Sequence, residues 1–407
     1  MIKKDTLVLY TSQFPCGSGE PFLRNEFAEL AQKFNKVFIL PLQFGAVTEI
    51  RNYDNAEVLN INSANEASSN TSLFLKNFFL ILNVTFYEFI HAKKKSIFLK
   101  HWREFNSYLI NCIRISMKME TIFQTKNISE SIHYSFWMNE WALALAVMKK
   151  QNKIPGFVFR ANGFDLYDQQ TKYNYVPYRS FIYSQAKRMF AVSKKASQHM
   201  KTYGVNSDHI THSYFGTEDL GISKFDPATK FTVLTCSDLR AIKRVHLMVD
   251  ILNHIPFPVK WIHHGHLGNA DHLLKEKLKA LNSNIEFEMH ERKEDYADVL
   301  KFIKETHSNL FVLLSETEGL PVSLIEAISF GIPLLATDVG GVSEVLNNEN
   351  GILIPKDFNT KEVADKIMSF AKSEQNTLEF RKRIREDWKK RFSAKNNYET
   401  FYKEISA

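Results

Sequence analysis

Short apolar runs alternate with segments of helical spacing throughout the second half of the chain. The strand-length runs lie at 231–237, 259–265, 285–290, 309–315 and 332–337. Between them apolar residues recur at three- and four-residue steps, as at Leu273, Leu274, Leu278 and Leu281. This alternation predicts a mostly parallel sheet with helices on both faces.

The first half begins with the same pattern. Residues 6–12 and 36–43 read as strands on either side of the helical segment 22–34, and further strands are predicted at 156–163 and 188–193. A chain of 407 residues is long enough for two domains. Because Gly, Asp and Pro interrupt both periodicities near 216–230, we predict two Rossmann-like α/β domains, 1–220 and 221–390.

Residues 72–126 depart from this alternation. The segment is rich in Phe, Leu and Ile and carries a basic cluster at Lys93, Lys94 and Lys95, but polar residues interrupt its apolar run before it could span a bilayer. One interpretation is a pair of amphipathic helices that pack on the first domain. The other is a surface that rests on an anionic membrane through aromatic insertion and lysine attraction. The two interpretations are compatible.

Charge and cysteine content narrow the functional classes. Residues 1–220 hold 26 Lys and Arg against 18 Asp and Glu, whereas residues 221–407 hold 26 against 27, so the basic excess belongs to the first half. No nucleic-acid motif is interleaved with the Phe-rich segment, and we do not expect a nucleic-acid partner. Cys16, Cys112 and Cys236 are widely spaced and form no disulfide framework or zinc motif. With no signal peptide read at the N-terminus, a cytoplasmic protein is expected.

The stretch "SETEGLPVSLIEAISFGIPLLATDVGG", residues 315–341, carries the most specific chemistry. It predicts a helix over 321–329 that follows the strand at 309–315 and begins without a side-chain cap, because Gly319 and Leu320 have no side-chain oxygen. The free N–H groups and the helix dipole favour an anion such as phosphate. Glu318 and Glu326 would then accept hydrogen bonds from hydroxyl groups on either side of the phosphates. The alternative is ordinary α/β architecture with solvated glutamates.

A second candidate element is the basic pair Lys243 and Arg244. It follows the strand at 231–237, and ligands of open α/β sheets bind at the carboxyl ends of strands. Cations there would neutralise a diphosphate and the charge of a leaving group. The alternative is a solvated basic turn.

These residues resemble a known family. "EGLPVSLIEA", with Glu318 and Glu326 as an E-x7-E pair, and the following "SFGIPLLATDVGGVSEVL" and "NGILIP" closely resemble the donor domain of retaining nucleotide-sugar glycosyltransferases of the GT-B fold, in the GT4 family. The segments 14–34, 133–147 and 159–168 resemble bacterial surface-polysaccharide members. The resemblance implies two Rossmann-like domains that face each other across a cleft, with a C-terminal helix, 391–407, crossing back to the first domain.

The resemblance also implies roles for individual residues. Glu326 would hold the ribose and Glu318 the hydroxyls of the donor sugar. Lys243 and the backbone around the turn would bind the diphosphate, the turn comprising Gly319, Leu320, Pro321 and Val322. A loop of small residues after the first strand would let the backbone approach the donor, namely Gly17, Ser18 and Gly19.

Two positions depart from the family pattern. Asp238 stands where an arginine is usual, so Arg240 or Arg244 would supply the second charge. Asn162 stands where a histidine commonly contacts the donor sugar, and an amide can donate hydrogen bonds there without carrying a positive charge. His133 is a further candidate for catalysis or for structure. Asp165 would either fix its own loop as an Asx turn or face the acceptor.

The activity implied is transfer of a sugar from a nucleotide diphosphate donor to a glycan or polyprenyl-diphosphate-linked glycan, with retention of configuration, in capsule, exopolysaccharide or lipopolysaccharide synthesis. The protein would work at the inner face of the cytoplasmic membrane. No cofactor and no metal are expected, since no Asp-x-Asp follows a strand. Two alternatives stay open: a sugar-nucleotide epimerase of similar fold, and a catalytically idle partner of a polysaccharide assembly complex.

Overall fold

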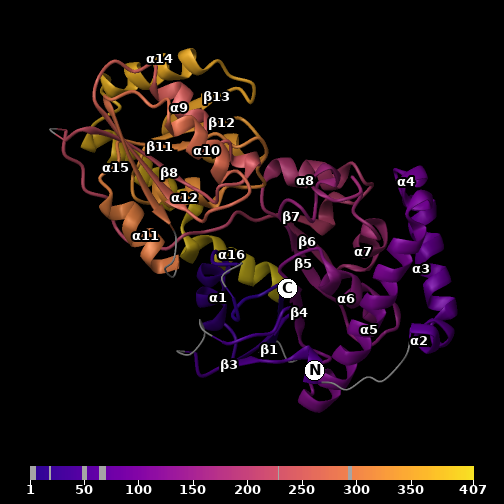
Figure 1. Ribbon diagram of the computed structural model, residues 1–407. Helices are drawn as coiled ribbons and strands as arrows, with labels where there is room; N and C mark the ends of the chain where they lie inside the picture. Colours follow the sequence, from indigo (N-terminus) through magenta and orange to yellow (C-terminus); the bar gives the residue numbers. More distant parts are fainter. Residues whose placement is uncertain (1–5, 18–19, 48–52, 64–69, 228, 292–295) are drawn as a thin grey trace. The chain divides into compact units, whose positions relative to one another are not determined.

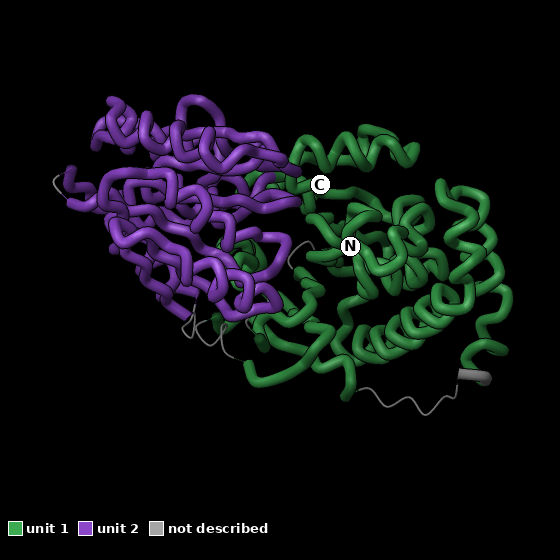
Figure 2. The backbone as a smooth tube through the Cα atoms, turned by 45° about the horizontal axis from the view of Figure 1, so that its top comes forward, with its two compact units in different colours: residues 1–213, 398–407 green, residues 214–397 purple. Residues whose placement is uncertain are grey.

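The computed structural model describes residues 6–17, 20–47, 53–63, 70–227, 229–291 and 296–407, which form two compact α/β units (Figures 1 and 2). Unit 1 comprises residues 1–213 and 398–407, and unit 2 comprises residues 214–397. The chain passes from one unit to the other just before the segment in which Gly, Asp and Pro interrupt the sequence pattern.

Unit 1 is built on a seven-stranded sheet in the order β3-β2-β1-β4-β5-β6-β7, and every pairing is parallel. Strand β1 pairs with β2 on one side and with β4, the central strand, on the other. The strands are β1 Thr6–Thr11, β2 Lys36–Pro41, β3 Ala56–Val58, β4 Ile132–Ser135, β5 Val158–Ala161, β6 Arg188–Ala191 and β7 Ile210–His212.

The helices that cover this sheet are α1 Leu23–Ala31, α6 Glu140–Lys150, α7 Arg179–Gln185 and α8 Lys194–Lys201. Helix α6 is buried over most of its length, from Trp141 to Met148, as its almost unbroken apolar sequence requires. Its first turn is capped by the Asn139 side chain, which accepts a hydrogen bond from the backbone N–H of Trp141.

The Phe-rich segment forms four helices, not the two that the sequence pattern indicates: α2 Asn70–Lys76, α3 Phe78–His91, α4 Lys95–Lys100 and α5 Trp102–Lys126. The breaks fall at Asn77, at Ala92–Lys94 and at His101, where the backbone of Asn77, Ala92, Lys94 and His101 leaves the helical region. Helices α2, α3 and α4 stand at the edge of unit 1 beside α5 (Figure 1).

Unit 2 has a six-stranded parallel sheet in the order β10-β9-β8-β11-β12-β13. The strands are β8 Phe231–Cys236, β9 Val259–Gly265, β10 Ile285–Glu291, β11 Leu310–Leu313, β12 Leu334–Thr337 and β13 Gly351–Ile354. The first three strands run outward from β8 in one direction and the last three run outward in the other. This order is that of a doubly wound Rossmann sheet, with its topological switch point between β8 and β11.

The helices of unit 2 are α9 Leu247–Leu252, α10 Asp271–Leu278, α11 Tyr296–Glu305, α12 Val322–Ser329, α13 Val342–Val345, α14 Thr360–Ala371 and α15 Leu378–Phe392. Helices α9 to α13 lie in the connections between successive strands, and α14 and α15 follow the last strand, β13. Leu324, Ile325 and Ile328 of α12 are fully buried, which fixes this helix firmly beneath the loops that precede it.

The C-terminal helix α16, Ala394–Ser406, belongs to unit 1 from residue 398 onward. Phe401 packs against Tyr134 and Phe190, and the guanidinium of the buried Arg160 lies 4.6 Å from its ring centroid. Glu399 forms an ion pair with Lys33 of unit 1. Trp388 is fully buried in unit 2, and its indole N–H donates to the Thr217 hydroxyl at 2.8 Å.

Candidate donor-binding site

The loops that follow β8 and β11 emerge side by side at the switch point of the second sheet, where open α/β sheets bind ligands. The loop after β8 ends in a short 3₁₀ turn, Ala241–Lys243, and the loop after β11 leads into α12. A backbone hydrogen bond of 2.8 Å from Glu316 N to Ile242 O joins the two loops directly. The candidate donor residues therefore lie on one edge of the sheet.

Lys243 and Glu318 are brought together by these loops. The Lys243 Nζ donates to Glu318 Oε1 at 2.6 Å, and the side chains are only 16% and 11% exposed. A charge-assisted hydrogen bond at this depth is stronger than a surface ion pair. Both residues were predicted from the sequence as donor ligands, and the structure places them in contact at the switch point.

The N-terminus of α12 lies beside this pair in the chain. Pro321 occupies the N-cap position with φ −73° and ψ 105°, and no side chain caps the helix. The helix begins at Val322, one residue later than predicted. Its first-turn N–H groups and dipole give this end the partial positive charge that suits phosphate.

Glu326 lies one turn further along α12 and is buried, at 5% exposed. The hydroxyl of Tyr296, the first residue of α11, donates to Glu326 Oε1. The Glu326 carboxylate can accept further hydrogen bonds while it accepts one from Tyr296. Glu326 and Tyr296 can therefore contact the same group of a ligand. Tyr296 carries no signal in the sequence, because one Tyr in an amphipathic helix looks like an ordinary core residue.

Glycines occupy positions where neighbouring loops approach each other too closely for a Cβ atom. Gly340 has a positive φ of 53°, and a Cβ built on it would lie 1.8 Å from the carbonyl oxygen of Glu318. The next residue, Gly341, donates its N–H to Gly319 O at 2.7 Å. On the other side of the site, a Cβ on Gly265 would lie 1.9 Å from Ser237 O. Glycine is therefore required where the loops after β9 and β12 support the candidate site.

Arg244 connects neighbouring loops of unit 2 through hydrogen bonds to their carbonyl groups. Its Nε donates to Leu314 O at 2.7 Å, and its Nη2 donates to Ser315 O and Lys356 O. It ties the loop after β8 to the loops after β11 and β13, and burial lowers the pKa of its guanidinium. Arg240, the other residue predicted to supply a second charge, is exposed, and Asp238 is partly buried. These contacts give Arg244 a structural role within unit 2.

In unit 1 the loop after β1 is organised by Glu20, which the sequence analysis did not identify. Its carboxylate accepts hydrogen bonds from the backbone N–H groups of Ser12, Gln13 and Phe14 at 3.0, 2.6 and 2.7 Å. It also accepts one from the Trp137 indole after β4. Of the predicted small-residue loop, Gly17 lies close to Gln13, whereas Ser18 and Gly19 lie outside the described residues.

Asn162 follows β5 in a loop that Asp165 fixes. The Asp165 carboxylate accepts from the backbone N–H groups of Asn162, Gly163 and Met138 at 2.9, 2.9 and 3.0 Å, which is the structural alternative of the two considered for it. The Asn162 side chain is 8% exposed and its Nδ2 donates to Phe136 O at 3.2 Å. Its Oδ1 has no hydrogen-bond partner among the described residues.

His133 has a core position, which does not support the predicted catalytic role. It lies within β4, not after a strand, and is 1% exposed with its ring stacked on Phe123. Because the carbonyl of Ser129 can only accept, Nε2 carries the proton, and Nδ1 accepts from the Tyr10 hydroxyl at 2.8 Å. Burial lowers the pKa of His133 to about 4, so the ring is neutral. Because it is buried, the ring also has no open face for a substrate.

Within the described parts of the chain, no group of three or more His, Cys, Asp or Glu side chains is arranged to hold a metal ion.

Comparison with known proteins finds similarity within the second unit. Residues 222–391 match the family described as "Glycosyl transferases group 1". The N-acetyl-alpha-D-glucosaminyl L-malate synthase of Bacillus anthracis is 32% identical over 101 residues, which are 24% of this chain and 26% of that protein. The O-antigen biosynthesis glycosyltransferase WbnH of Escherichia coli is 44% identical over 57 residues, 14% of this chain and 17% of that protein. The family match therefore lies within unit 2, and the chain matches about a quarter or less of these relatives' lengths.

Similarity to solved structures extends over both units. The structure of Anabaena Alr3699/HepE in complex with UDP covers 98% of this chain and 99% of its own, with a TM-score of 0.71 and 16% sequence identity. The same protein has been solved with UDP-glucose, at a TM-score of 0.68. At this identity the similarity establishes the fold: two parallel α/β domains of the GT-B class, as the sequence predicts.

Proposed function

We propose that this protein is a nucleotide-sugar-dependent glycosyltransferase that transfers a hexosyl or related sugar to a glycan or polyprenyl-diphosphate-linked glycan. The observation that carries the proposal is the Lys243–Glu318 pair next to the uncapped start of α12, at the switch point of a group 1 glycosyltransferase domain. The alternative of a solvated turn is disfavoured because both side chains of the pair are largely buried.

The proposed roles follow from charge and position. Lys243 and the N–H groups at the start of α12 bind the diphosphate and stabilise the negative charge that develops on it as it leaves. Glu318 accepts hydrogen bonds from the hydroxyls of the donor sugar, and Glu326 accepts them from the ribose. In this scheme the diphosphate replaces Glu318 as the partner of Lys243, which releases the carboxylate for the sugar.

We further propose transfer with retention of the anomeric configuration, as in GT4 enzymes. The acceptor hydroxyl would approach on the face that the leaving phosphate occupies, and the departing phosphate oxygen would take its proton. No protein carboxylate is then needed as a nucleophile, and Lys243 with the helix N-terminus supplies the charge stabilisation that a metal supplies elsewhere. Activity should persist in a chelator, and the anomer of the product, read by NMR, tests retention.

The names of similar proteins support the proposed substrates. The Anabaena structure contains UDP or UDP-glucose, and WbnH is named for O-antigen biosynthesis. We therefore propose a uridine diphosphate sugar as the first donor to test, and a surface polysaccharide, such as capsule or lipopolysaccharide, as the product.

A thermal-shift titration tests the donor site. The full chain is titrated with UDP, GDP, CDP, ADP and dTDP and with their common sugar conjugates, because a ligand of the folded state raises its melting temperature. One nucleotide should stabilise the protein, and Glu326→Ala should weaken that shift. Glu305→Ala, which removes an exposed carboxylate from the same unit, is the matched control. No shift from any nucleotide would contradict the proposal.

A second candidate is a catalytically idle partner in a polysaccharide assembly complex. It is favoured by Asn162 and Asp238, which stand where related enzymes commonly have histidine and arginine. Under this alternative the double variant Asn162→His/Asp238→Arg gains donor turnover that the native chain lacks. Under the main proposal the native chain already turns over donor when a suitable acceptor is supplied.

A further inference from the structure

Helix α3 has two apolar faces, and only one of them is used by the fold. Ile81, Val84 and Glu88 point into unit 1 and are nearly fully buried. Exposed on the other face are four large apolar side chains at steps of three and four residues: Phe79 at 84%, Leu82 at 50%, Phe86 at 64% and Ile90 at 47%. This spacing places them in one stripe along the helix. A helix face in contact with water would normally be polar at these positions.

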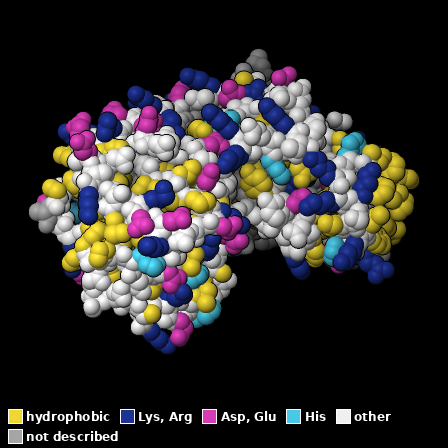
Figure 3. Space-filling model, turned by 90° about the horizontal axis from the view of Figure 1, so that it is seen from above, with side chains coloured by type: hydrophobic (Ala, Val, Ile, Leu, Met, Phe, Trp, Pro, Cys, Tyr) yellow, Lys and Arg dark blue, Asp and Glu magenta, His cyan; other side chains and the backbone are white. Residues whose placement is uncertain are grey.

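The stripe is part of a larger patch on α2–α5. Nine of the fourteen exposed large hydrophobic residues in the described parts of the chain lie between residues 74 and 102. Besides the stripe they are Phe74, Leu75, Phe78, Leu99 and Trp102. Figure 3 shows hydrophobic side chains gathered at this edge of unit 1, with Lys and Arg side chains beside them. Clustering of this kind marks an interaction site, whereas the five remaining exposed hydrophobics are scattered along the chain.

The charges around the patch are mostly positive, although the exposed Glu104 follows Arg103 in the first turn of α5. Residues 70–103 contain six Lys or Arg and a single acidic residue, Glu88, which is buried. Lys76, Lys95, Lys100 and Arg103 are exposed at the ends of the helices that carry the patch. No charged side chain lies on the exposed face of α3 itself. The surface is thus an apolar centre with cationic ends.

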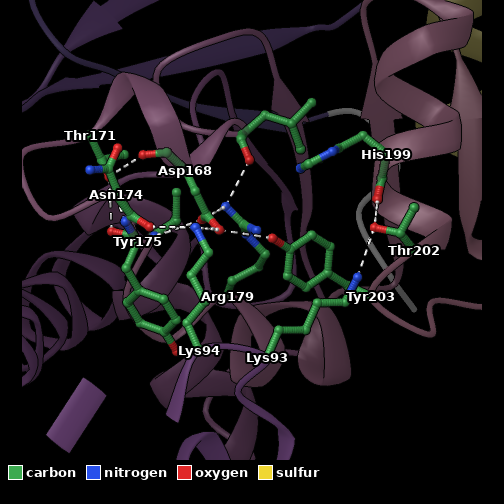
Figure 4. A network of polar contacts seen from close by, with 12 residues as sticks. Lys93, Lys94, Asp168, Thr171, Asn174, Tyr175, Arg179, His199, Thr202 and Tyr203 are labelled. Atoms are coloured by element: carbon green, nitrogen blue, oxygen red, sulfur yellow. Dashed lines mark hydrogen bonds and ion pairs between the residues drawn. The ribbon is translucent and has the colours of Figure 1, made fainter. Parts of the chain in front are cut away.

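Two further lysines connect the turn after α3 to other parts of unit 1 (Figure 4). Lys94 pairs with Asp168 at 3.0 Å, and Asp168 in turn binds Arg179 at 2.8 Å. Lys93 donates to the Thr202 hydroxyl at 3.0 Å and lies over the Tyr203 ring. These contacts join the turn after α3 to the loop after β5 and to α7 and α8. The exposed stripe is consequently presented by a helix fixed to the fold.

We propose that this patch docks the protein on an anionic phospholipid membrane, at the inner face of the cytoplasmic membrane. The Phe and Leu side chains of the stripe enter the boundary between headgroups and acyl chains, while Lys76, Lys95, Lys100 and Arg103 contact the headgroups. Aromatic residues flanked by lysines are typical of helices that lie in the interface. No helix in the described ranges is long and apolar enough to cross a membrane. The proposal rests on this surface alone and is independent of the donor site.

Co-flotation of the full chain with vesicles tests the proposal. The vesicles are phosphatidylcholine alone or phosphatidylcholine mixed with phosphatidylglycerol, at low and at high salt. The protein should bind the anionic vesicles, and salt should weaken binding because it screens the lysines. Phe79→Ser/Phe86→Ser should reduce binding roughly tenfold or more. The matched control is Leu273→Ser/Leu378→Ser, which changes two exposed leucines of unit 2.

Lys→Glu variants separate the contribution of the lysines to membrane binding from that of the apolar stripe. Lys76→Glu/Lys95→Glu/Lys100→Glu should abolish the preference for anionic vesicles, whereas Lys366→Glu/Lys372→Glu/Lys382→Glu in unit 2 should not. Thermal melts should show the stripe variant and the triple Lys→Glu variant of the patch folded, since the substituted side chains are exposed. Equal binding to neutral vesicles, or unchanged binding by the stripe variant, would overturn the proposal. If the stripe variant instead converts a dimer to a monomer in ultracentrifugation without affecting flotation, the occupant is a second copy of this chain.

Discussion

Lys243 and Glu318 lie 75 residues apart in the sequence and meet at 2.6 Å at the switch point of the second sheet. Each comes from a different strand–helix loop, and glycines at positions where a Cβ would not fit hold the neighbouring loops in place. The pair combines a cation for phosphate with a carboxylate for hydroxyl groups. The proposed function depends on this relationship more than on any other contact.

Glu318→Gln should separate binding of the diphosphate from recognition of the sugar. The variant removes the negative partner of Lys243, so affinity for the nucleoside diphosphate should be unchanged or higher. The extra affinity that the sugar part of the donor contributes should fall, and turnover should fall as well. Each loss should be roughly tenfold or more, as expected when a hydrogen bond to a charged group is removed. Calorimetric titrations with the diphosphate and its sugar conjugate measure both quantities. A parallel loss of affinity for both ligands would contradict the assigned role.

Tyr296→Phe tests whether Tyr296 acts through Glu326. Loss of the hydroxyl should weaken nucleotide binding, because the buried carboxylate loses the donor that orients it. In a Glu326→Ala background the same change should have no further effect, as expected for two residues that act as one unit. Tyr175→Phe removes a similar bond, to Glu88 in unit 1, and should leave nucleotide binding unchanged. Additive losses in the double variant would show that the two residues act separately.

Gly340→Ala should displace the loop that carries Glu318. The new Cβ would lie 1.8 Å from Glu318 O at a positive φ, and we expect a loss of at least about 2 kcal/mol in the free energy of unfolding together with weakened donor binding. Gly204→Ala is the control, because its φ of 75° is also positive but nothing lies within 4 Å. It should cost about 1 kcal/mol and leave binding intact. Urea unfolding and nucleotide titration of both variants measure these effects.

Glu88 makes a pH-dependent contribution to stability. Burial raises its pKa to about 7 from the usual 4.5, against hydrogen bonds from Tyr175 and Phe181 that lower it. At a pH between these two pKa values, Glu88 is ionised in the unfolded state but keeps its proton in the native state. The contribution of Glu88 to the free energy of unfolding is therefore lost as the pH rises. Glu88→Gln should therefore gain stability over the native chain from about pH 5 to about pH 8, by up to about 3 kcal/mol.

Glu57→Gln provides a comparison of opposite sign. A hydrogen bond from Lys126 lowers the pKa of Glu57, so its contribution is present above the unfolded pKa and is lost as the pH falls. This variant should be less stable than the native chain at neutral pH. The difference should shrink in acid. Urea unfolding across the pH range measures both variants, and a Glu88→Gln difference that does not vary with pH would contradict the assignment.

The parts of the fold that were predictable are those with long apolar runs. The five strands expected in unit 2 are present with small shifts of their ends. Strands β3, β4 and β7 have only three or four residues, with Glu57, His133 and Thr211 among them, and such short mixed runs do not stand out from loops. The Phe-rich segment was assigned too few helices because the breaks at Asn77 and His101 fall inside continuous apolar spacing.

The candidate site was predictable only where a motif marks it. Glu318, Glu326 and Lys243 follow recognisable strand–loop–helix patterns. Tyr296 and Glu20 act through contacts with residues 30 and 117 positions away, Glu326 and Trp137, which only tertiary structure brings close. The orientation of the Arg244 side chain likewise depends on carbonyl groups of other loops, to which it donates hydrogen bonds. For His133 the sequence left catalysis and structure open, because a polar residue near a strand end resembles a site residue even when it lies in the core.

The most direct test of the central claim is the affinity of the native chain and of Lys243→Ala for the nucleoside diphosphate that stabilises the protein best, measured by calorimetry. If Lys243 holds the diphosphate, the variant should bind at least roughly tenfold more weakly, while Lys372→Ala, which removes an exposed lysine of the same unit, should bind like the native chain. Equal affinity of Lys243→Ala and the native chain would contradict the donor site described for this protein.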